Sequence, residues 1–205
     1  TSFSLSNHNQ DSRYGTTSYI AQQNIAFGQL FWDKNVKDIH NLVIGTALRY
    51  NYYDDNTYAT QSTDSLNVTN KPEDYLLPGI FAQDEISINE RNKLLLGLRY
   101  DYDERHGSIL TPRANYKWSA NDNNIIRLSF GTGYRVVNLF TEDHAATTGA
   151  REVIVVGTLK PEQSYNVNLN YQKFISTSFG FINFDAALFY TYFTNKIAPD
   201  YETNP

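Results

Sequence analysis

Residues 136–159 contain the densest group of side chains that could do chemistry. Glu142, Asp143 and His144 are adjacent there, and Arg151 follows in the same segment. Carboxylates and imidazole are ligand types that divalent metals accept. Adjacent residues on an irregular loop chelate poorly unless other segments add ligands. We therefore expect solvated loop charge here, with no metal and no cofactor.

The remaining titratable groups do not form a catalytic constellation. The four histidines are scattered, and Asp103, Glu104 and His106 lie together on a predicted loop, with no serine nucleophile or third member in an obvious role. The chain has no Cys, which excludes disulfides, thiol catalysis and Cys-based zinc sites. Residues 131–135 lie within a predicted strand with no helix after them, unlike a phosphate-binding loop. We therefore expect a protein that is not an enzyme.

A second polar segment, residues 54–78, is rich in Asn, Thr, Ser and Tyr. Such side chains suit hydrogen bonding to a polar ligand such as a sugar or a siderophore, and they suit any exposed loop equally well. We interpret both segments as candidate ligand-binding loops. The candidate residues are Asn138, Glu142, Asp143, His144, Arg151, Asp54, Tyr58 and Tyr75.

The elements that must position these loops are strands. In residues 161–174, Tyr165, Val167, Leu169 and Tyr171 alternate with Ser, Asn and Gln, which gives one apolar and one amide-rich face. No apolar run reaches the roughly 18 residues that a spanning helix needs. The alternation predicts nine strands, at residues 1–8, 18–32, 42–52, 79–88, 94–103, 111–118, 125–135, 161–174 and 181–195. The alternation is weaker in the first, second and fourth of these, and the fourth mixes its faces, so its orientation stays open.

The connections between these strands alternate in length. The short ones are residues 33–37, 89–93, 119–124 and 175–180, and the mostly longer ones are residues 9–17, 54–78, 104–110 and 136–160. Several Tyr residues fall near the long-loop ends of the apolar faces, and Trp32 and Trp118 fall at the short-turn ends. This segregation and the two aromatic girdles are typical of outer-membrane barrels.

The fold class predicted is therefore all-β, an antiparallel transmembrane β-barrel segment. A soluble domain of two packed sheets is the weaker alternative. The net charge of −5 disfavours a nucleic-acid partner. Single-chain bacterial barrels have even strand numbers. Nine predicted strands therefore point to part of a larger barrel.

On this prediction the polar strand faces line a lumen. The arginines there either contact an anionic ligand or a plug that fills the lumen, or pair across the wall with acids such as Asp101, Asp103 and Asp185, and we favour pairing. A glycine inside a strand marks a bend or a close approach by another segment, and both readings stay open. The predicted lumen-facing residues are Arg99, Arg113, Arg127, Gly131, Gly133 and Arg135.

Five motifs in a fixed order carry a resemblance to a known family. They are PGIFAQDEI (78–86), LLLGLRYDYD (94–103), TPRANYKWS (111–119), IRLSFGTGYRVVNLF (126–140) and LKPEQSYNVNLNY (159–171). Together they resemble the barrel of TonB-dependent outer-membrane receptors. The resemblance implies a barrel of about 22 strands around a plugged lumen. Residues 1–205 are then a partial barrel domain, with the plug outside this chain and Gly131 and Gly133 leaving clearance for it.

The same resemblance implies a location and a function. The location is the outer membrane of a Gram-negative bacterium, and the function is TonB-coupled import of a scarce nutrient such as an iron–siderophore, haem or cobalamin. The partners implied are outer-membrane lipid, a periplasmic TonB-type energy-coupling protein and the small-molecule nutrient. A passive porin-like channel is the main alternative, because it shares the polar lumen. An outer-membrane barrel enzyme is the weaker one.

Overall fold

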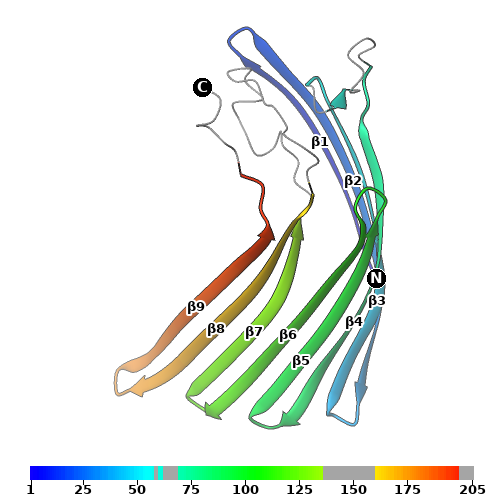
Figure 1. Cartoon of the computed structure of the whole chain (residues 1–205). Coiled ribbons are helices and arrows are strands. Elements are labelled where there is room, and N and C mark those ends of the chain that lie inside the picture. The colour runs from blue at the N-terminus through cyan, green and yellow to red at the C-terminus, as the bar shows by residue number, and fades with distance from the viewer. Residues whose placement is uncertain (58–59, 62–68, 136–159, 199–205) are drawn as a thin grey trace.

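The computed structural model describes residues 1–57, 60–61, 69–135 and 160–198, which form nine strands in one antiparallel sheet in chain order. Figure 1 shows a curved sheet of tilted strands, with β1 at one edge and β9 at the other. The strands are β1 (Ser2–Tyr14), β2 (Thr17–Val36), β3 (His40–Asp55), β4 (Glu73–Asn89), β5 (Asn92–Asp103), β6 (Gly107–Asn121), β7 (Asn124–Arg135), β8 (Glu162–Thr177) and β9 (Gly180–Asn195). The predicted all-β fold class is confirmed. Among the described residues, no helix is long and apolar enough to cross a membrane.

Four tight turns lie together at one end of the sheet, at residues 37–39, 90–91, 122–123 and 178–179. Asparagine side chains stabilise three of them. The oxygens of Asn35, Asn89 and Asn121 accept bonds of 3.0 Å from the backbone N–H groups of Asp38, Arg91 and Asn123 respectively. Asn favours turns because its short side chain bonds its own backbone. The four turns lie near their predicted positions and are shorter than predicted, since residues 33–36, 119–121 and 175–177 continue β2, β6 and β8.

The opposite end differs from the prediction at three connections, one of which, the predicted loop at 54–78, is shortened by β3 to Asp55 and by β4 from Glu73. Residues 9–14 and 107–110, which were expected in loops, continue β1 and β6, so that only residues 15–16 and 104–106 turn the chain. Gly15 and Gly107 have φ of 63° and 77° there, a region that glycine enters without strain. The β1–β2 hairpin therefore extends the sheet at its loop end (Figure 1).

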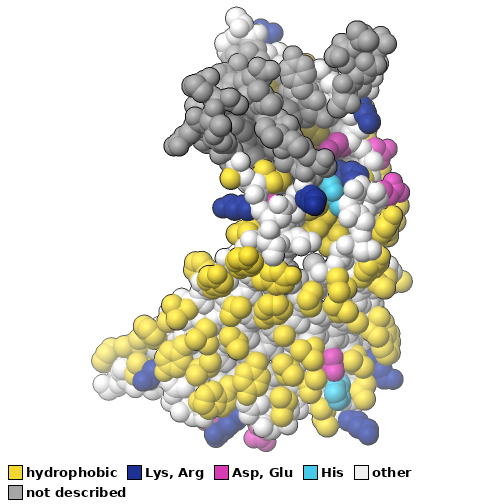
Figure 2. Space-filling view, viewed as in Figure 1, with side chains coloured by type: hydrophobic (Ala, Val, Ile, Leu, Met, Phe, Trp, Pro, Cys, Tyr) yellow, Lys and Arg dark blue, Asp and Glu magenta, His cyan; other side chains and the backbone are white. Residues whose placement is uncertain are grey.

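The two faces of the sheet have different chemistry. The outer face is the one that carries Leu128, Leu169 and Leu188, which pair in one row across β7, β8 and β9. Its large apolar side chains are exposed; Leu169 is 42% exposed and Leu188 73% exposed. Figure 2 shows apolar side chains covering the sheet on the face turned toward the viewer. The inner face is the one that carries the predicted lumen residues.

β4 is the strand whose orientation the sequence left open. Ile80 pairs with Tyr100 and lies on the outer face, whereas Phe81 pairs with Arg99 and lies on the inner face. Phe81 fits there because β3 offers Gly45 beside it. A Cβ at Gly45 would lie 2.5 Å from Phe81 Cζ. An aromatic ring on the inner face therefore depends on a glycine in the neighbouring strand.

Candidate functional site

The six predicted lumen residues share the inner face. Cross-strand partners lie on one face of an antiparallel sheet, and the register links Arg113 to Gly131 and Arg99 to Thr111. Within β7, residues 127, 131, 133 and 135 follow the same alternation. The structure therefore brings the four arginines and two glycines onto one wall.

Arg99 forms an ion pair within this wall. Its Nε and Nη2 donate to the two carboxylate oxygens of Asp101 at 2.7 and 2.6 Å. The Asp101 side chain is only 9% exposed. A bidentate pair fixes both side chains. The predicted pairing of a wall arginine with Asp101 agrees with this geometry.

Arg113 has a different partner from the one expected. It lies on β6 opposite Gly97 of β5, and Gly97 lies opposite Gln83 of β4. The Arg113 guanidinium crosses over Gly97 and donates to the side-chain oxygen of Gln83. A Cβ at Gly97 would lie 2.7 Å from Arg113 Nε. Its partner is thus a neutral amide, reached because Gly97 leaves the path open.

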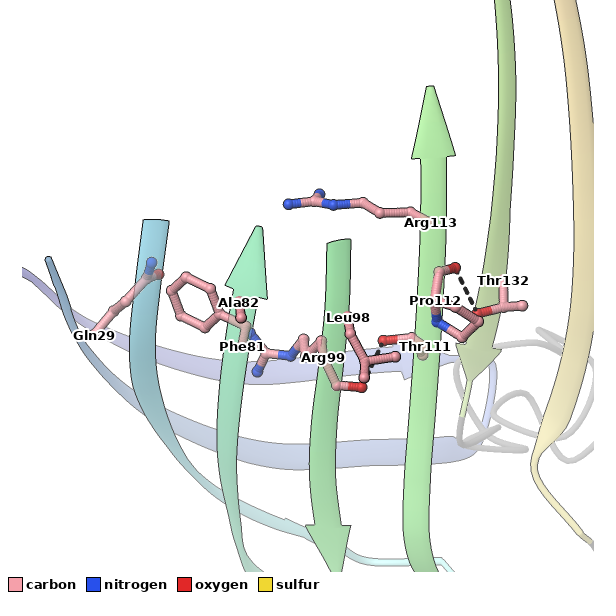
Figure 3. Close-up of a pocket in the computed structure, with 9 residues that line it drawn as sticks. All are labelled: Gln29, Phe81, Ala82, Leu98, Arg99, Thr111, Pro112, Arg113 and Thr132. Carbon is pink, nitrogen blue, oxygen red and sulfur yellow. Dashed lines mark hydrogen bonds between the residues drawn. The ribbon is translucent and has the colours of Figure 1, made fainter. Parts of the chain in front are cut away.

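A hollow of about 300 Å³ lies beside these two arginines. Figure 3 shows Phe81 and Gln29 on one side of it, with Arg99 in the middle and Arg113 extended above the strands. The Arg99 guanidinium carbon lies 5.9 Å from the Phe81 ring centre. An aromatic ring flanked by guanidinium groups suits a flat or anionic polar molecule.

Arg127 belongs to an amide network on β7, β8 and β9. Its Nη1 donates at 3.2 Å to both Asn170 and Gln172. The Asn170 amide donates in turn to Asp185 at 2.7 Å. Asp185, expected to pair with an arginine, therefore meets Arg127 only through Asn170. Asn170 on the polar face of β8 thus links Arg127 of β7 to Asp185 of β9, and Gln172 on the same face gives Arg127 a second acceptor.

At the loop end of the wall, the buried carboxylate of Asp103 pairs with Arg105, and the sequence did not predict this pair. Asp103, with a side chain 2% exposed, accepts from Arg105 Nη2 at 3.2 Å and from the Arg105 backbone N–H at 2.8 Å. Burial alone would raise the pKa of Asp103, but the hydrogen bonds and charge of Arg105 outweigh it and lower that pKa. Arg105 also lies 3.8 Å from the Tyr75 ring centre and 3.6 Å from Glu73. Asp103 therefore pairs with a turn residue, and not with a wall arginine as predicted.

Arg135 and Glu162 join β7 to β8 at the same end. The Arg135 Nη2 lies 2.7 Å from the Glu162 carboxylate, whose side chain is 5% exposed. The backbone N–H of Ile197 donates to Glu162 at 2.9 Å. That bond and Arg135 together lower the pKa of Glu162 despite its burial. Residues on either side of segment 136–161 are thereby tied together.

Two of the eight candidate ligand residues lie in described strands. Asp54 is in β3 and accepts from Asn70 at 3.1 Å, and Tyr75 is in β4 under Arg105. Both were expected in the loop at 54–78, but β3 runs on to Asp55 and β4 begins at Glu73. The other predicted loop residues lie outside the described part of the chain: Tyr58, Asn138, Glu142, Asp143, His144 and Arg151.

The two predicted lumen glycines differ in their surroundings. A Cβ at Gly133 would lie 2.6 Å from Ser164 Oγ, so Gly133 makes room for its neighbour on β8. A Cβ at Gly131 would meet nothing within 4 Å. Crowding by Ser164 within the wall explains why residue 133 is a glycine, whereas no neighbour in the described wall explains the glycine at 131. In residues 1–57, 60–61, 69–135 and 160–198, no three His, Asp or Glu side chains gather as a metal site.

Comparison with known proteins gives a family match over the full sequence. The sequence profile described as TonB dependent receptor-like, beta-barrel, matches residues 1–205. An iron-regulated outer membrane virulence protein of Vibrio cholerae serotype O1 is 30% identical over 92 residues, which is 44% of this chain. That match spans 14% of the relative's own length.

Solved structures show the same sheet in larger proteins. The siderophore receptor PirA of Pseudomonas aeruginosa superposes with a TM-score of 0.70 over 98% of this chain and 37% of its own, at 13% identity. A mutant of the ferric enterobactin receptor PfeA of the same organism has a TM-score of 0.62 over 87% of this chain and 27% of its own, at 17% identity. These likenesses show the fold alone, and the chain spans about a third or less of each receptor.

Proposed function

Because this chain belongs to the TonB dependent receptor-like β-barrel family, we propose that it forms one wall of a receptor that imports a ferric siderophore by TonB-coupled transport. The family is one of receptors in the Gram-negative outer membrane and not of enzymes. The outer face of the sheet is accordingly its lipid-facing side, and the inner face lines the lumen. Haem and cobalamin are the alternative nutrients.

The choice of cargo rests on which wall arginines have a carboxylate partner. Arg99 is neutralised by Asp101, whereas Arg113 and Arg127 contact side-chain amides. An amide satisfies the geometry of a guanidinium but not its charge. The charges of Arg113 and Arg127 therefore face the lumen without a contacting carboxylate among the described residues, which favours a negatively charged cargo.

The relatives support an iron chelate as that cargo. Two of the superposed proteins are described as a siderophore receptor and a ferric enterobactin receptor, and the curated relative as iron-regulated. Ferric catecholates carry several negative charges, whereas many ferric hydroxamates are neutral. We infer that the anionic class is the better match to Arg113 and Arg127.

The test is uptake of radioactive iron by cells that express the native protein and lack other siderophore receptors. We expect uptake from ferric catecholate in excess of uptake from neutral ferric hydroxamate. Deletion of the energy-coupling partner should reduce uptake to background. Unchanged uptake in that strain, together with free entry of small hydrophilic solutes, would overturn the proposal in favour of a porin-like channel.

A variant set sharpens this test. Arg113→Gln and Arg127→Gln should each lower catecholate uptake several-fold, because each removes a charge that no carboxylate offsets. Lys93→Gln, on the inner face near the short-turn end, is the matched control, because Glu85 already offsets the Lys93 charge at 2.9 Å. Equal losses in all three variants would contradict a specific role for Arg113 and Arg127.

A further inference from the structure

A carboxylate lies inside the apolar field of the outer face. Asp84 of β4 lies between Leu42 of β3 and Leu96 of β5 in one row of the sheet. Figure 2 shows an acidic and a histidine side chain side by side among apolar side chains low on this face. A charge on a lipid-facing surface is costly, so its presence calls for a partner.

The protein satisfies Asp84 only in part. His40 Nδ1 lies 2.7 Å from Asp84 Oδ2, and Asp84 Oδ1 is covered and has no hydrogen-bond partner among the described residues. The side chain of Asp84 is nevertheless 24% exposed, and that exposed area lies on its other atoms. An ionised carboxylate accepts about four hydrogen bonds. Because Oδ1 is covered, a further donor from the lipid side would bind Oδ2, whose hydrogen-bond partner among the described residues is His40.

A cation stands on the other side of the same leucine. Lys34 of β2 pairs with Leu42, which pairs with Asp84, so Lys34 and Asp84 flank Leu42 in one row. Two strand spacings separate their backbones, about 10 Å. The Lys34 ammonium lies 5.7 Å from the centre of the exposed Trp32 ring. Tryptophan marks the level of lipid headgroups in membrane proteins.

All of these residues lie at the short-turn end of the barrel. Lys34 is near the end of β2, which closes at Val36, and His40 is the first residue of β3. Short turns face the periplasm in outer-membrane barrels. The adjoining leaflet is built from phospholipids, whose headgroups reach this level.

We propose that Lys34, His40 and Asp84 form a binding site for the headgroup of phosphatidylethanolamine. The headgroup ammonium donates to Asp84, which His40 holds in place, and the phosphate contacts Lys34. The two charges of this headgroup are two carbons apart and match an acid and a base on either side of Leu42. An anionic headgroup without an amine would contact Lys34 but would give Asp84 no hydrogen-bond donor.

The experiment is native mass spectrometry of the receptor extracted from the outer membrane, stripped of lipid and exchanged into mixed micelles. The probes are phosphatidylethanolamine and phosphatidylcholine with identical acyl chains, because the trimethylated amine of the second cannot donate a hydrogen bond. We expect about tenfold greater retention of phosphatidylethanolamine, which corresponds to 1.4 kcal/mol. Equal retention of the two lipids would overturn the proposal.

The variants separate the two halves of the site. Asp84→Asn should lower retention of phosphatidylethanolamine to the level of phosphatidylcholine, and Lys34→Gln should lower retention of both. Glu85→Gln, the neighbouring acid on the inner face, which pairs with Lys93 at 2.9 Å, should change neither. Heat-modified mobility on gels checks that each variant folds. A receptor that is dimeric as wild type and monomeric as Asp84→Asn would place a second copy on this face and overturn the lipid site.

Discussion

At the residue scale, the wall depends on glycines that leave room for polar side chains of the neighbouring strand. Gly97 lies under Arg113 on its path to Gln83, and Gly133 makes room for Ser164. Gly131 has no such neighbour. Side chains on a barrel wall thus lie across strands, and the residue beneath them must be small.

Replacement of Gly97 and Gly131 by alanine should distinguish a glycine that a neighbouring side chain covers from one that has open space above it. Gly97→Ala should lower the free energy of unfolding by about 1–2 kcal/mol, because the added methyl displaces Arg113. Gly131→Ala should change it by less than about 0.5 kcal/mol. Urea denaturation in detergent micelles, followed by tryptophan fluorescence, measures both. Similar losses for the two variants would show that strand propensity and not crowding sets the cost.

Gly131→Ala also tests clearance in the intact receptor. If a plug approaches the wall at this glycine, the variant should import its chelate more slowly while its unfolding midpoint stays unchanged. The measurement is iron uptake beside denaturation of the same variant. Unchanged uptake would leave barrel curvature as the reason for Gly131.

The buried carboxylate of Asp103 should make the loop end sensitive to acid. Its pKa is lowered in the folded state, so it stabilises the fold above the ordinary Asp range near pH 4 and loses that contribution as pH falls below it. The wild-type unfolding midpoint should therefore drop as the pH falls below about 4, and Asp103→Asn should reduce the drop. Glu104→Gln, at an exposed position next to it, is the control.

At the element scale, the turn between β2 and β3 is strained. Lys37 and Asp38 have φ of 55° and 56°, in the left-handed region that only glycine adopts freely. Asp38→Gly should raise the free energy of unfolding by about 0.5–1 kcal/mol and leave lipid retention unchanged. Chemical denaturation measures the free energy of unfolding. A decrease would show that the added freedom of glycine in the unfolded chain outweighs the strain that it relieves in the turn.

The strands were predictable where one face is apolar. Side-chain alternation is local, so β5, β7 and β8 could be located and their faces assigned from the sequence alone. In β1 the residues after Ser6 are polar on both faces, and the signal disappears although hairpin hydrogen bonds continue to Tyr14. β4 could not be oriented because its inward Phe81 depends on Gly45 of another strand.

The candidate site was predictable only as a set of side chains on one face. The face of Arg113 follows from alternation, whereas its partner Gln83 depends on the register of β4, β5 and β6. The pairing of Asp103 with Arg105 depends on the conformation of a turn. Register and turn geometry arise from the whole sheet, so a linear sequence leaves these partners open.

At the scale of the whole molecule, the sheet is inverted relative to a soluble protein. Leu169 near the middle of β8 faces lipid, and its neighbour Asn168 faces the lumen. Leu169→Arg should lower the free energy of unfolding by about 2–4 kcal/mol, and Asn168→Arg should be close to neutral. Unfolding in phospholipid vesicles measures both. The opposite ranking would reverse the assignment of the two faces.

The order of the strands also has a consequence for assembly. Each of the nine described strands pairs with the next described strand along the chain. Six of the eight hairpins among them close over only two or three residues and bring together segments already close in sequence. Closure of β7 on β8 must instead bring together strands separated by residues 136–161. The entropy cost of joining chain ends rises with the length between them, and contacts distant in sequence slow folding. The β7–β8 hairpin should therefore be the late step in building this wall, and the Arg135–Glu162 ion pair at its open end is placed to hold that hairpin once it forms.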